Sequence, residues 1–275
     1  MNERSKTRGQ LRSAALRPSR GRGQNFIVDP TVINRIIEFG RPAASQNIVE
    51  IGPGLGALTK RLSEYVPTLT AIEVEAALCE QLSRELPSAR FINRDVREVA
   101  FNELGDDLVV FGNLPYSLST DILFHLIENG RYLSRAVLML QREFAERVAA
   151  PPGGRDYGVL SISAQLWCDA RLGAVIDGGA FHPRTKVESR LLELVFLKQP
   201  RFAVEDLKWF RKVVQASFLQ RRRMIKNSLQ HAGFLAADQI NSALAQVGIL
   251  PTQRAETVSI EQFVALSKAL SPVGE

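Results

Sequence analysis

Short apolar runs alternate with segments of helical periodicity along the first two thirds of the chain. Apolar residues three or four positions apart predict helices, and Ile33, Ile36 and Ile37 follow Asp29-Pro30, a typical helix start. Between the helices, buried strands are predicted at 48–51, 69–72, 90–92, 108–111 and 136–140. Strands that alternate with helices in short steps are typical of an α/β fold with a parallel, doubly wound sheet.

The pattern changes near Pro200. Before it, the apolar runs 159–167 and 191–197 are interpreted as strands that complete the sheet, and after it only helical periodicity remains. Ser259 and Gln262 have the spacing of a capping box at the start of the last helix. The sequence therefore predicts three parts: a flexible basic arm (1–22), an α/β domain (23–199) and a small all-helical domain (200–275).

Composition excludes several classes of protein. Hydrophobic residues make up 45% of the 275-residue chain and charged residues 23%, as in an ordinary globular protein. No apolar run approaches the roughly 18 residues needed to cross a bilayer. Cys79 and Cys168 are far apart and lack metal-ligand spacing, so reduced thiols in a cytoplasmic protein are expected. Membrane proteins and secreted disulfide scaffolds are excluded, and we expect a monomer without a bound metal.

Positive charge is concentrated in two segments. Residues 1–22 carry a net charge of +6 and residues 198–226 a net charge of +7, whereas residues 23–197 carry −5. Two basic segments on an acidic body favour a polyanionic partner such as nucleic acid, although a solvated tail and a solvated helix face are the alternative. The arm also has the composition of an organelle transit peptide. Arg222, Arg223 and Lys226 have helical spacing and are predicted to form one basic stripe that contacts RNA phosphates.

A glycine-rich loop and two acidic residues follow consecutive predicted strands. The loop is Glu50-Ile-Gly52-Pro-Gly-Leu-Gly, and its spacing differs from the dinucleotide-binding pattern. Glu73 lies 21 positions after Gly52, at the end of the second strand, and Asp95 follows the third. Each acid alone is better explained as a helix cap or a surface charge. Together with the glycine loop, their order favours a cofactor that contains adenosine, with one carboxylate on the ribose.

Asn113-Leu114-Pro115-Tyr116 closes the fourth predicted strand, beside the expected cofactor. The exocyclic amine of adenine is a poor nucleophile, and acceptors that hold its hydrogens let the nitrogen become pyramidal. The Asn113 side chain and the Leu114 carbonyl would provide two such acceptors, and Tyr116 a face on which an unstacked base can lie. A tight turn with a buried tyrosine is the alternative explanation of this segment.

Further motifs extend the pattern from Gly23 nearly to the C-terminus. They are Gly23-Gln-Asn-Phe-Ile-Val-Asp29, Ser119-Thr120, Gln141-Arg-Glu143, Asp156-Tyr-Gly158, Phe181-His-Pro183 with Lys186-Val187, and Arg254-Ala-Glu256. With the two segments above, the chain resembles the ribosomal RNA adenine dimethyltransferase family. This resemblance implies a class I, Rossmann-like methyltransferase domain with a small helical domain, and S-adenosylmethionine as the methyl donor.

The resemblance also implies a substrate. Leu114 and the Arg254-Ala-Glu256 segment are similar to the small-subunit enzymes of the family, whereas large-subunit resistance methylases more often have Ile at the former position. The expected substrate is two adjacent adenosines in the 3′-terminal hairpin of small-subunit (16S) rRNA, within a pre-assembled subunit. A resistance methylase of 23S rRNA, and a non-catalytic RNA-binding assembly or transcription factor on the same fold, are the alternatives.

Carried over by position, the family's motifs give a role to each site residue. Asn25 and Ile27 are expected at the methionine part of the cofactor, Gly52 against it, Glu73 on its ribose, Asp95 on its adenine, Asn113 and Leu114 on the target amine, and Tyr116 and Phe181 on either side of the flipped base. The sequence departs from the family at Thr185, where a second Pro is usual, and at Ser117-Leu118, where Asn-Ile is usual. The loop that holds Phe181 is therefore expected to be less rigid.

Overall fold

The computed structural model describes residues 25–233 and 235–271, which fall into two compact units. The first unit comprises the described residues of Met1–Ala145 together with Asp169–Lys198, and the second Glu146–Cys168 together with those of Gln199–Glu275. The contacts thus group Glu146–Cys168 with the C-terminal helices, whereas the sequence pattern placed these residues in the α/β domain. The predicted arm, 1–22, lies outside the described residues.

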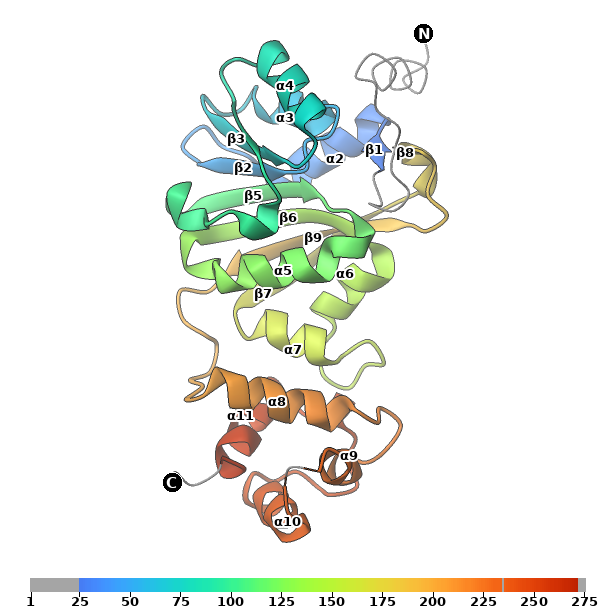
Figure 1. Cartoon of the computed structure of the whole chain (residues 1–275). Helices are drawn as coiled ribbons and strands as arrows, with labels where there is room; N and C mark the ends of the chain where they lie inside the picture. The colour runs from blue at the N-terminus through green and yellow to red at the C-terminus, as the bar shows by residue number, and fades with distance from the viewer. Residues whose placement is uncertain (1–24, 234, 272–275) are drawn as a thin grey trace. The chain divides into compact units, whose positions relative to one another are not determined.

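A seven-stranded sheet forms the centre of the first unit (Figure 1). Its strands, in spatial order, are β4 (Arg90–Asn93), β3 (Leu69–Glu73), β2 (Ile48–Ile51), β5 (Leu108–Asn113), β6 (Leu133–Gln141), β9 (Ser189–Phe196) and β7 (Cys168–Ile176). The strands from β4 to β6 are parallel, but β9 runs antiparallel to β6. The expectation of an all-parallel sheet is therefore wrong at one end.

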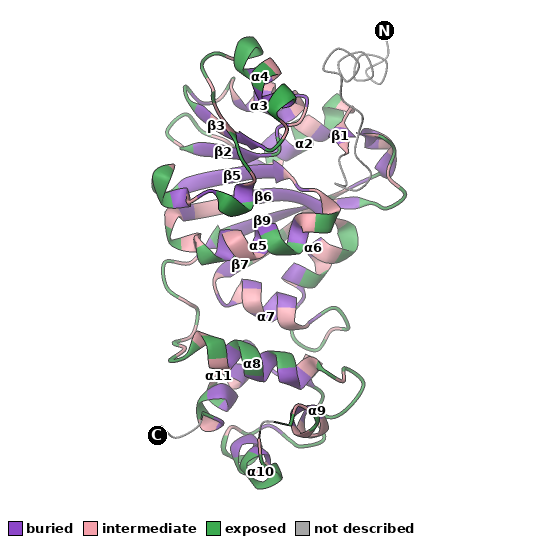
Figure 2. Cartoon of the chain, in the orientation of Figure 1, coloured by how far each residue is buried: buried purple, intermediate pink, exposed green. Residues whose placement is uncertain are grey.

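Helices cover this sheet and are interleaved with its strands. They are α2 (Pro30–Gly40), α3 (Ala57–Leu62), α4 (Ala76–Glu85), α5 (Ser119–Glu128) and α6 (Arg142–Ala149), whose last residues belong to the second unit. The Asp29 side chain caps α2 by accepting the N–H of Thr31 at 2.9 Å, so this predicted helix start is confirmed. The central strands β5 and β6 are buried over most of their length (Figure 2).

The second unit is helical, with α7 (Val159–Gln165), α8 (Leu207–Phe218), α9 (Ile225–His231), α10 (Ala237–Gln246) and α11 (Ile260–Ala269). The strand predicted at 159–167 is wrong, because these residues form α7. Ser161 accepts the N–H of Gly158 at 3.1 Å and donates to the carbonyl of Arg147 at 2.6 Å, which fixes the first turn. Buried apolar side chains at helical spacing, including Ile162, then hold α7 against the other helices.

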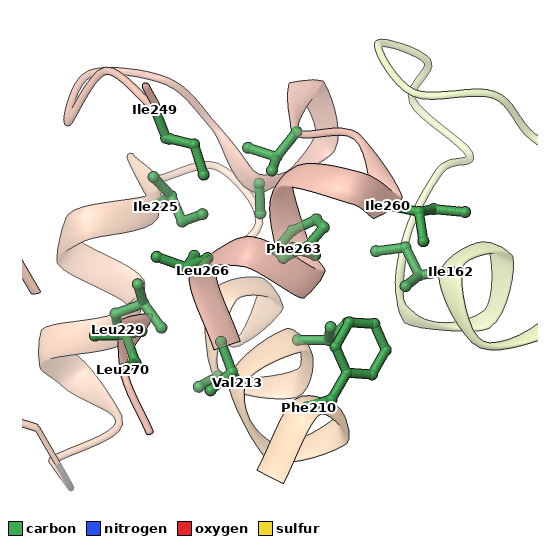
Figure 3. Close-up of a cluster of buried hydrophobic side chains, with 14 of the residues drawn as sticks. Ile162, Phe210, Val213, Ile225, Leu229, Ile249, Ile260, Phe263, Leu266 and Leu270 are labelled. Atoms are coloured by element: carbon green, nitrogen blue, oxygen red, sulfur yellow. The ribbon is translucent and has the colours of Figure 1, made fainter. Parts of the chain in front are cut away.

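One apolar core joins these helices (Figure 3). Its labelled members are Ile162, Phe210, Val213, Ile225, Leu229, Ile249, Ile260, Phe263, Leu266 and Leu270. Ser259 and Gln262 form the predicted capping box of α11, with each side chain accepting the other's backbone N–H at 3.1 Å. Across the described residues, none of the helices has the length and apolar character that a membrane span requires.

Candidate active site

A cavity of about 700 Å³ lies at the carboxyl ends of the parallel strands in the first unit. The chain runs from β2 through β3 to β4 on one side and then crosses to β5 on the other side of β2, and ligands bind at such a switch point in open α/β sheets. The cavity is lined by all six residues expected to contact the cofactor: Asn25, Ile27, Gly52, Glu73, Asp95 and Asn113. The residues that the sequence predicts to contact the cofactor therefore line one cavity in the structure. Their individual contacts with the cofactor stay predictions.

The glycine-rich loop adopts a backbone that other residues rarely adopt. Gly52, Gly54 and Gly56 have φ angles of 67°, 58° and 79°. A Cβ at Gly54 would lie 3.0 Å from the Phe26 ring, and one at Gly56 would lie 2.4 Å from Leu82. At Gly52 no atom would come within 4 Å, so the space beside this residue is open. The loop thus packs tightly on two sides and exposes its backbone to the cavity at Gly52.

Backbone groups hold Glu73 at the end of β3. One of its carboxylate oxygens accepts the N–H of Gly54 at 3.2 Å and the other accepts the N–H of Glu75 at 2.9 Å. The residue is only 5% exposed, yet it lines the cavity. A carboxylate has several acceptor sites, so these two bonds leave capacity for hydroxyl donors of a ligand.

Glu50 also lines the cavity and was given no role by the sequence analysis. It is 2% exposed, and within the described part of the chain its Oε2 atom has no hydrogen-bond partner. Burial, reinforced by the negative charge of Glu73, raises the pKa of Glu50 to about 8. The side chain is therefore mainly protonated at neutral pH and has a hydrogen to donate. The signal available in the sequence was an acid within the apolar run Ile48–Ile51.

Asp95 forms an ion pair that shapes the opposite part of the lining. Its Oδ2 lies 2.6 Å from Nη2 of Arg97, whose Nη1 lies 3.3 Å from Asp121. The hydrogen bonds from Arg97 lower the pKa of Asp95 and keep it ionised. Arg97 itself lines the cavity, so a cation that the motif did not predict stands beside the expected adenine contact.

Asn113 is held by the chain segment that precedes β1 (Phe26–Ile27). Its Nδ2 donates to the carbonyl oxygen of Asn25 at 2.8 Å, which fixes the amide so that Oδ1 stays an acceptor. The N–H of Leu114 donates to the carbonyl of Met139 at 3.1 Å and fixes the backbone at the next position. Both residues line the cavity. Two acceptors, a side-chain amide and a backbone carbonyl, thus follow one another where β5 ends.

The two predicted aromatic partners do not line the cavity. Tyr116 is partly exposed, and its hydroxyl lies 2.7 Å from that of Ser189. Phe181 is 1% exposed and packs in a hydrophobic cluster of the first unit. It belongs to β8 (Phe181–His182), which pairs with β1. Neither ring contributes to the lining of this cavity, and the sandwich stays a prediction.

Thr185 ties down the loop after β8. Its N–H donates to the carbonyl of Gly178 at 3.2 Å, and its hydroxyl donates to the carbonyl of Val187 at 2.7 Å. The hydroxyl thus supplies an anchor that a proline lacks.

The predicted basic stripe does not lie on one helix. α8 ends at Phe218 and α9 begins at Ile225, so Arg222 and Arg223 belong to the turn between them and only Lys226 is helical. The N–H of Arg223 closes this turn on the carbonyl of Gln220 at 2.8 Å. The helical geometry was wrong because Met224 has an extended backbone (ψ 146°), which interrupts the helical path before the buried Ile225 begins α9. Arg222 and Arg223 are exposed, and their contact with RNA stays a prediction.

No group of three or more His, Cys, Asp or Glu side chains in residues 25–233 and 235–271 is placed to hold a metal ion. Both cysteines are buried and unpaired with each other.

Comparisons with known proteins agree with this arrangement. The family model described as "Ribosomal RNA adenine dimethylase" matches residues 18–271. The ribosomal RNA small subunit methyltransferase A of Geobacter metallireducens is 39% identical over 96% of this chain and 99% of its own length. The corresponding enzyme of Myxococcus xanthus is 37% identical over 96% of this chain and 94% of its own length. The crystal structure of a dimethyladenosine transferase from Plasmodium falciparum has a TM-score of 0.75 at 21% identity, covering 88% of this chain and 95% of that one. The crystal structure of the 23S rRNA methyltransferase ErmE has a TM-score of 0.69 at 22% identity, covering 90% of this chain and 100% of that one.

These two structural matches establish the shared fold of a methyltransferase domain followed by helices, and the sequence matches extend over nearly the whole chain. The chain therefore belongs to the ribosomal RNA adenine dimethylase family.

Proposed function

We propose that this chain is an S-adenosylmethionine-dependent dimethyltransferase that acts on N6 of adenosines in small-subunit rRNA. Its family and the small-subunit methyltransferases that match it over nearly their full length support this function. The observation that carries the chemistry is the hydrogen bond from Asn113 to the Asn25 carbonyl, because it leaves the Asn113 Oδ1 atom as an acceptor at the cavity. A binding protein without activity would have no need of this pair of acceptors.

The cavity fits the cofactor. Gly52 exposes backbone beside open space, Glu73 is held at the cavity by backbone N–H groups, and the buried Glu50 has an unpartnered oxygen among the described residues. In our proposal Glu73 accepts from the ribose hydroxyls, Asp95 accepts from the adenine amine, and Asn25 and Ile27 lie at the methionine part. When bound, S-adenosylmethionine supplies an electrophilic methyl group on a positively charged sulfur.

The protein's own contribution is to align the target amine. Asn113 Oδ1 and the Leu114 carbonyl each accept one N–H of the adenine N6 amine. The two hydrogens are then held on the side of the nitrogen away from the incoming methyl group, and the nitrogen becomes pyramidal. The nitrogen lone pair then points along the line of transfer. No strong base is required for this alignment, because the extra proton of the methylated amine passes to water after the transfer.

Tyr116 provides a surface for the adenine once it has left the RNA helix. Flipping a base costs a few kcal/mol, and stacking on an aromatic ring returns about 1–3 kcal/mol. The hydrogen bond to Ser189 holds the Tyr116 ring in one orientation. Phe181 is buried in this conformation, so its stacking role requires β8 to move.

The proposed substrate is the pair of adjacent adenosines in the 3′-terminal hairpin of 16S rRNA, in a pre-assembled small subunit. Arg222, Arg223 and Lys226 are proposed to contact its phosphates, and the protein to work as a cytoplasmic monomer without a metal. The decisive experiment maps dimethyladenosine in rRNA from cells that lack this gene and are complemented with the wild type or with Asn113→Ala. Restoration by the wild type alone supports the proposal. Methylation that appears in the large subunit instead would support the resistance-methylase alternative.

A further inference from the structure

A second cavity, of about 350 Å³, lies in the first unit between α2 and the strands β7 and β9. Its lining includes three arginines, Arg35, Arg41 and Arg171, together with Glu38 and Phe39. None of these residues lines the larger cavity described above. The second cavity is therefore separate from the candidate active site.

Packing fixes the guanidinium group of Arg171 in this cavity. Its Cζ atom lies 4.2 Å from the centre of the Phe39 ring, in a cation–π contact. Phe39 fits there because residue 173 is glycine, and a Cβ at Gly173 would lie 2.8 Å from the Phe39 ring. A stacked guanidinium keeps the N–H groups at its edge available for planar acceptors.

A buried carboxylate holds three arginines at the same place. Glu193 of β9 is 4% exposed in its side chain, and its oxygens lie 2.8 Å from Arg171, 3.2 Å from Arg135 and 3.5 Å from Arg41. The side chains of Arg41 and Arg171 are 69% and 52% exposed, so their outer N–H groups remain accessible. One carboxylate cannot neutralise three guanidinium groups, and it positions them with an excess of positive charge.

One further arginine adds to this excess. Arg35 is exposed on α2 and forms no ion pair with any residue in the described part of the chain. Counting Arg35, Arg41, Arg135 and Arg171 against Glu38 and Glu193, the cluster carries +2. It does so within a segment, 23–197, whose net charge is −5.

We propose that this arginine cluster binds a backbone phosphate of the rRNA substrate and serves as a docking site distinct from the methylation site. The inference rests on the proposed function, because it takes rRNA as the polyanion that the protein meets. Arginine edges match the planar arrangement of two phosphate oxygens, and a cluster of excess charge +2 complements one phosphodiester. Contacts of this kind position RNA without reading its sequence.

The test uses Arg35→Ala and the double variant Arg35→Ala/Arg171→Ala in the full chain. Glu193 keeps Arg41 and Arg135 as partners in both variants, so the carboxylate is not left unpaired. Arg84→Ala is the matched control, because Arg84 is also an exposed helical arginine, with a side chain 78% exposed. Binding to small ribosomal subunits from cells that lack the gene is measured between about 50 and 200 mM KCl.

We expect both variants to bind subunits several-fold more weakly and to lower the slope of log affinity against log salt by about one unit. Affinity for S-adenosylmethionine should not change, and Arg84→Ala should behave as wild type. Wild-type affinity and slope in the double variant would overturn the proposal. The stability of each protein against unfolding is also measured with and without inorganic phosphate. If phosphate stabilises the wild type but not the variants, and the variants still bind subunits normally, the site binds small anions only and the proposal is overturned. Methyl transfer by the wild type is measured in parallel, and its failure would reject the proposed function while leaving the binding comparison interpretable.

Discussion

The hydroxyl oxygens of Tyr116 and Ser189 lie 2.7 Å apart and join the segment after β5 to the first residue of β9. Ser189 is fully buried, so the bond anchors the outer edge of a partly exposed ring to the interior of the sheet. The proposed stacking residue is therefore fixed at both ends, by its backbone and by its hydroxyl.

Two substitutions of Tyr116 distinguish the hydrogen bond of its hydroxyl from the stacking surface of its ring. Tyr116→Phe keeps the ring and loses one hydrogen bond, worth about 0.5–1.5 kcal/mol, so a modest fall in activity is expected. Tyr116→Ala also loses the stacking surface, worth about 1–3 kcal/mol, and should be far more damaging. The measurement is kcat/KM with small subunits as substrate, and Ser189→Ala, which removes the same hydrogen bond from the other side, is the control for Tyr116→Phe. Equal activity of the Phe and Ala variants would exclude stacking.

Asn113→Ala should separate catalysis from cofactor binding. The substitution removes the Oδ1 acceptor, and loss of such a contact costs roughly a hundredfold or more in rate. Affinity for S-adenosylmethionine, measured by titration calorimetry, should stay largely intact. Turnover close to wild type at saturating cofactor would contradict the assignment.

Glu73→Ala should have the opposite effect, weakening cofactor binding first. The carboxylate is proposed to accept from the ribose, and hydrogen bonds to a charged group contribute about 1.5–3 kcal/mol, or roughly ten- to a hundredfold in affinity. Calorimetry of the variant beside Glu80→Ala, an acid that is 69% exposed on α4, provides the comparison. If both variants bind the cofactor as the wild type does, the ribose role is refuted.

Glu50 should make folding stability depend on pH in an unusual direction. Its pKa is raised from 4.5 to about 8 in the folded protein, so the folded state holds its proton more tightly than the unfolded state. The contribution of this proton to the free energy of unfolding is complete below pH 4.5. It is lost as the pH rises towards 8, by up to about 1.4 kcal/mol per pH unit. Glu50→Gln cannot ionise, and its stability relative to wild type should increase over this range. Urea unfolding of the cofactor-free proteins at several pH values measures this difference, and a constant difference would contradict the raised pKa.

Reversal of charge at the turn between α8 and α9 tests the proposed RNA contact of the helical unit. Arg222→Glu/Arg223→Glu should weaken subunit binding and flatten its salt dependence, with S-adenosylmethionine affinity unchanged. Both residues are exposed, so the core should tolerate the change. Deletion of residues 1–22, for which the sequence predicts an arm of net charge +6, should act in the same direction but less strongly, because the ordering of such an arm on docking would cost entropy. A double variant that binds subunits normally at low and physiological salt would leave these arginines as solvated surface charges.

The sequence predicts correctly that these residues share one cavity, because several of them lie at strand ends. Once β2, β3 and β5 are recognised as parallel neighbours, Gly52, Glu73 and Asn113 must meet at one edge of the sheet. This inference needs only the order of strands. It does not require any knowledge of side-chain orientation.

The errors concern properties that packing decides. The apolar run 159–167 fits a strand or a buried helix equally well, and the contacts of Ile162 with the helical core select the helix. The burial of Phe181 also depends on packing, because the motif does not give the direction of its ring, but the role proposed for this residue is untested and is not one of the errors. The raised pKa of Glu50 likewise depends on burial that a sequence motif does not reveal.

The pairing of β1 with β8 has a consequence for synthesis of the chain. Ile27 pairs with Phe181, so residues near the start of the described chain wait for a partner that is made about 150 residues later. Asn25, which orients Asn113, immediately precedes β1 and depends on this late partner for its position. Formation of this side of the larger cavity is thus a non-local event, and it is slow because a long loop must close first. A nascent chain released before β8 emerges from the ribosome would lack the strand that pairs with β1, whose two residues line the cavity, so translation itself delays the appearance of a complete cavity until most of the α/β unit has been made.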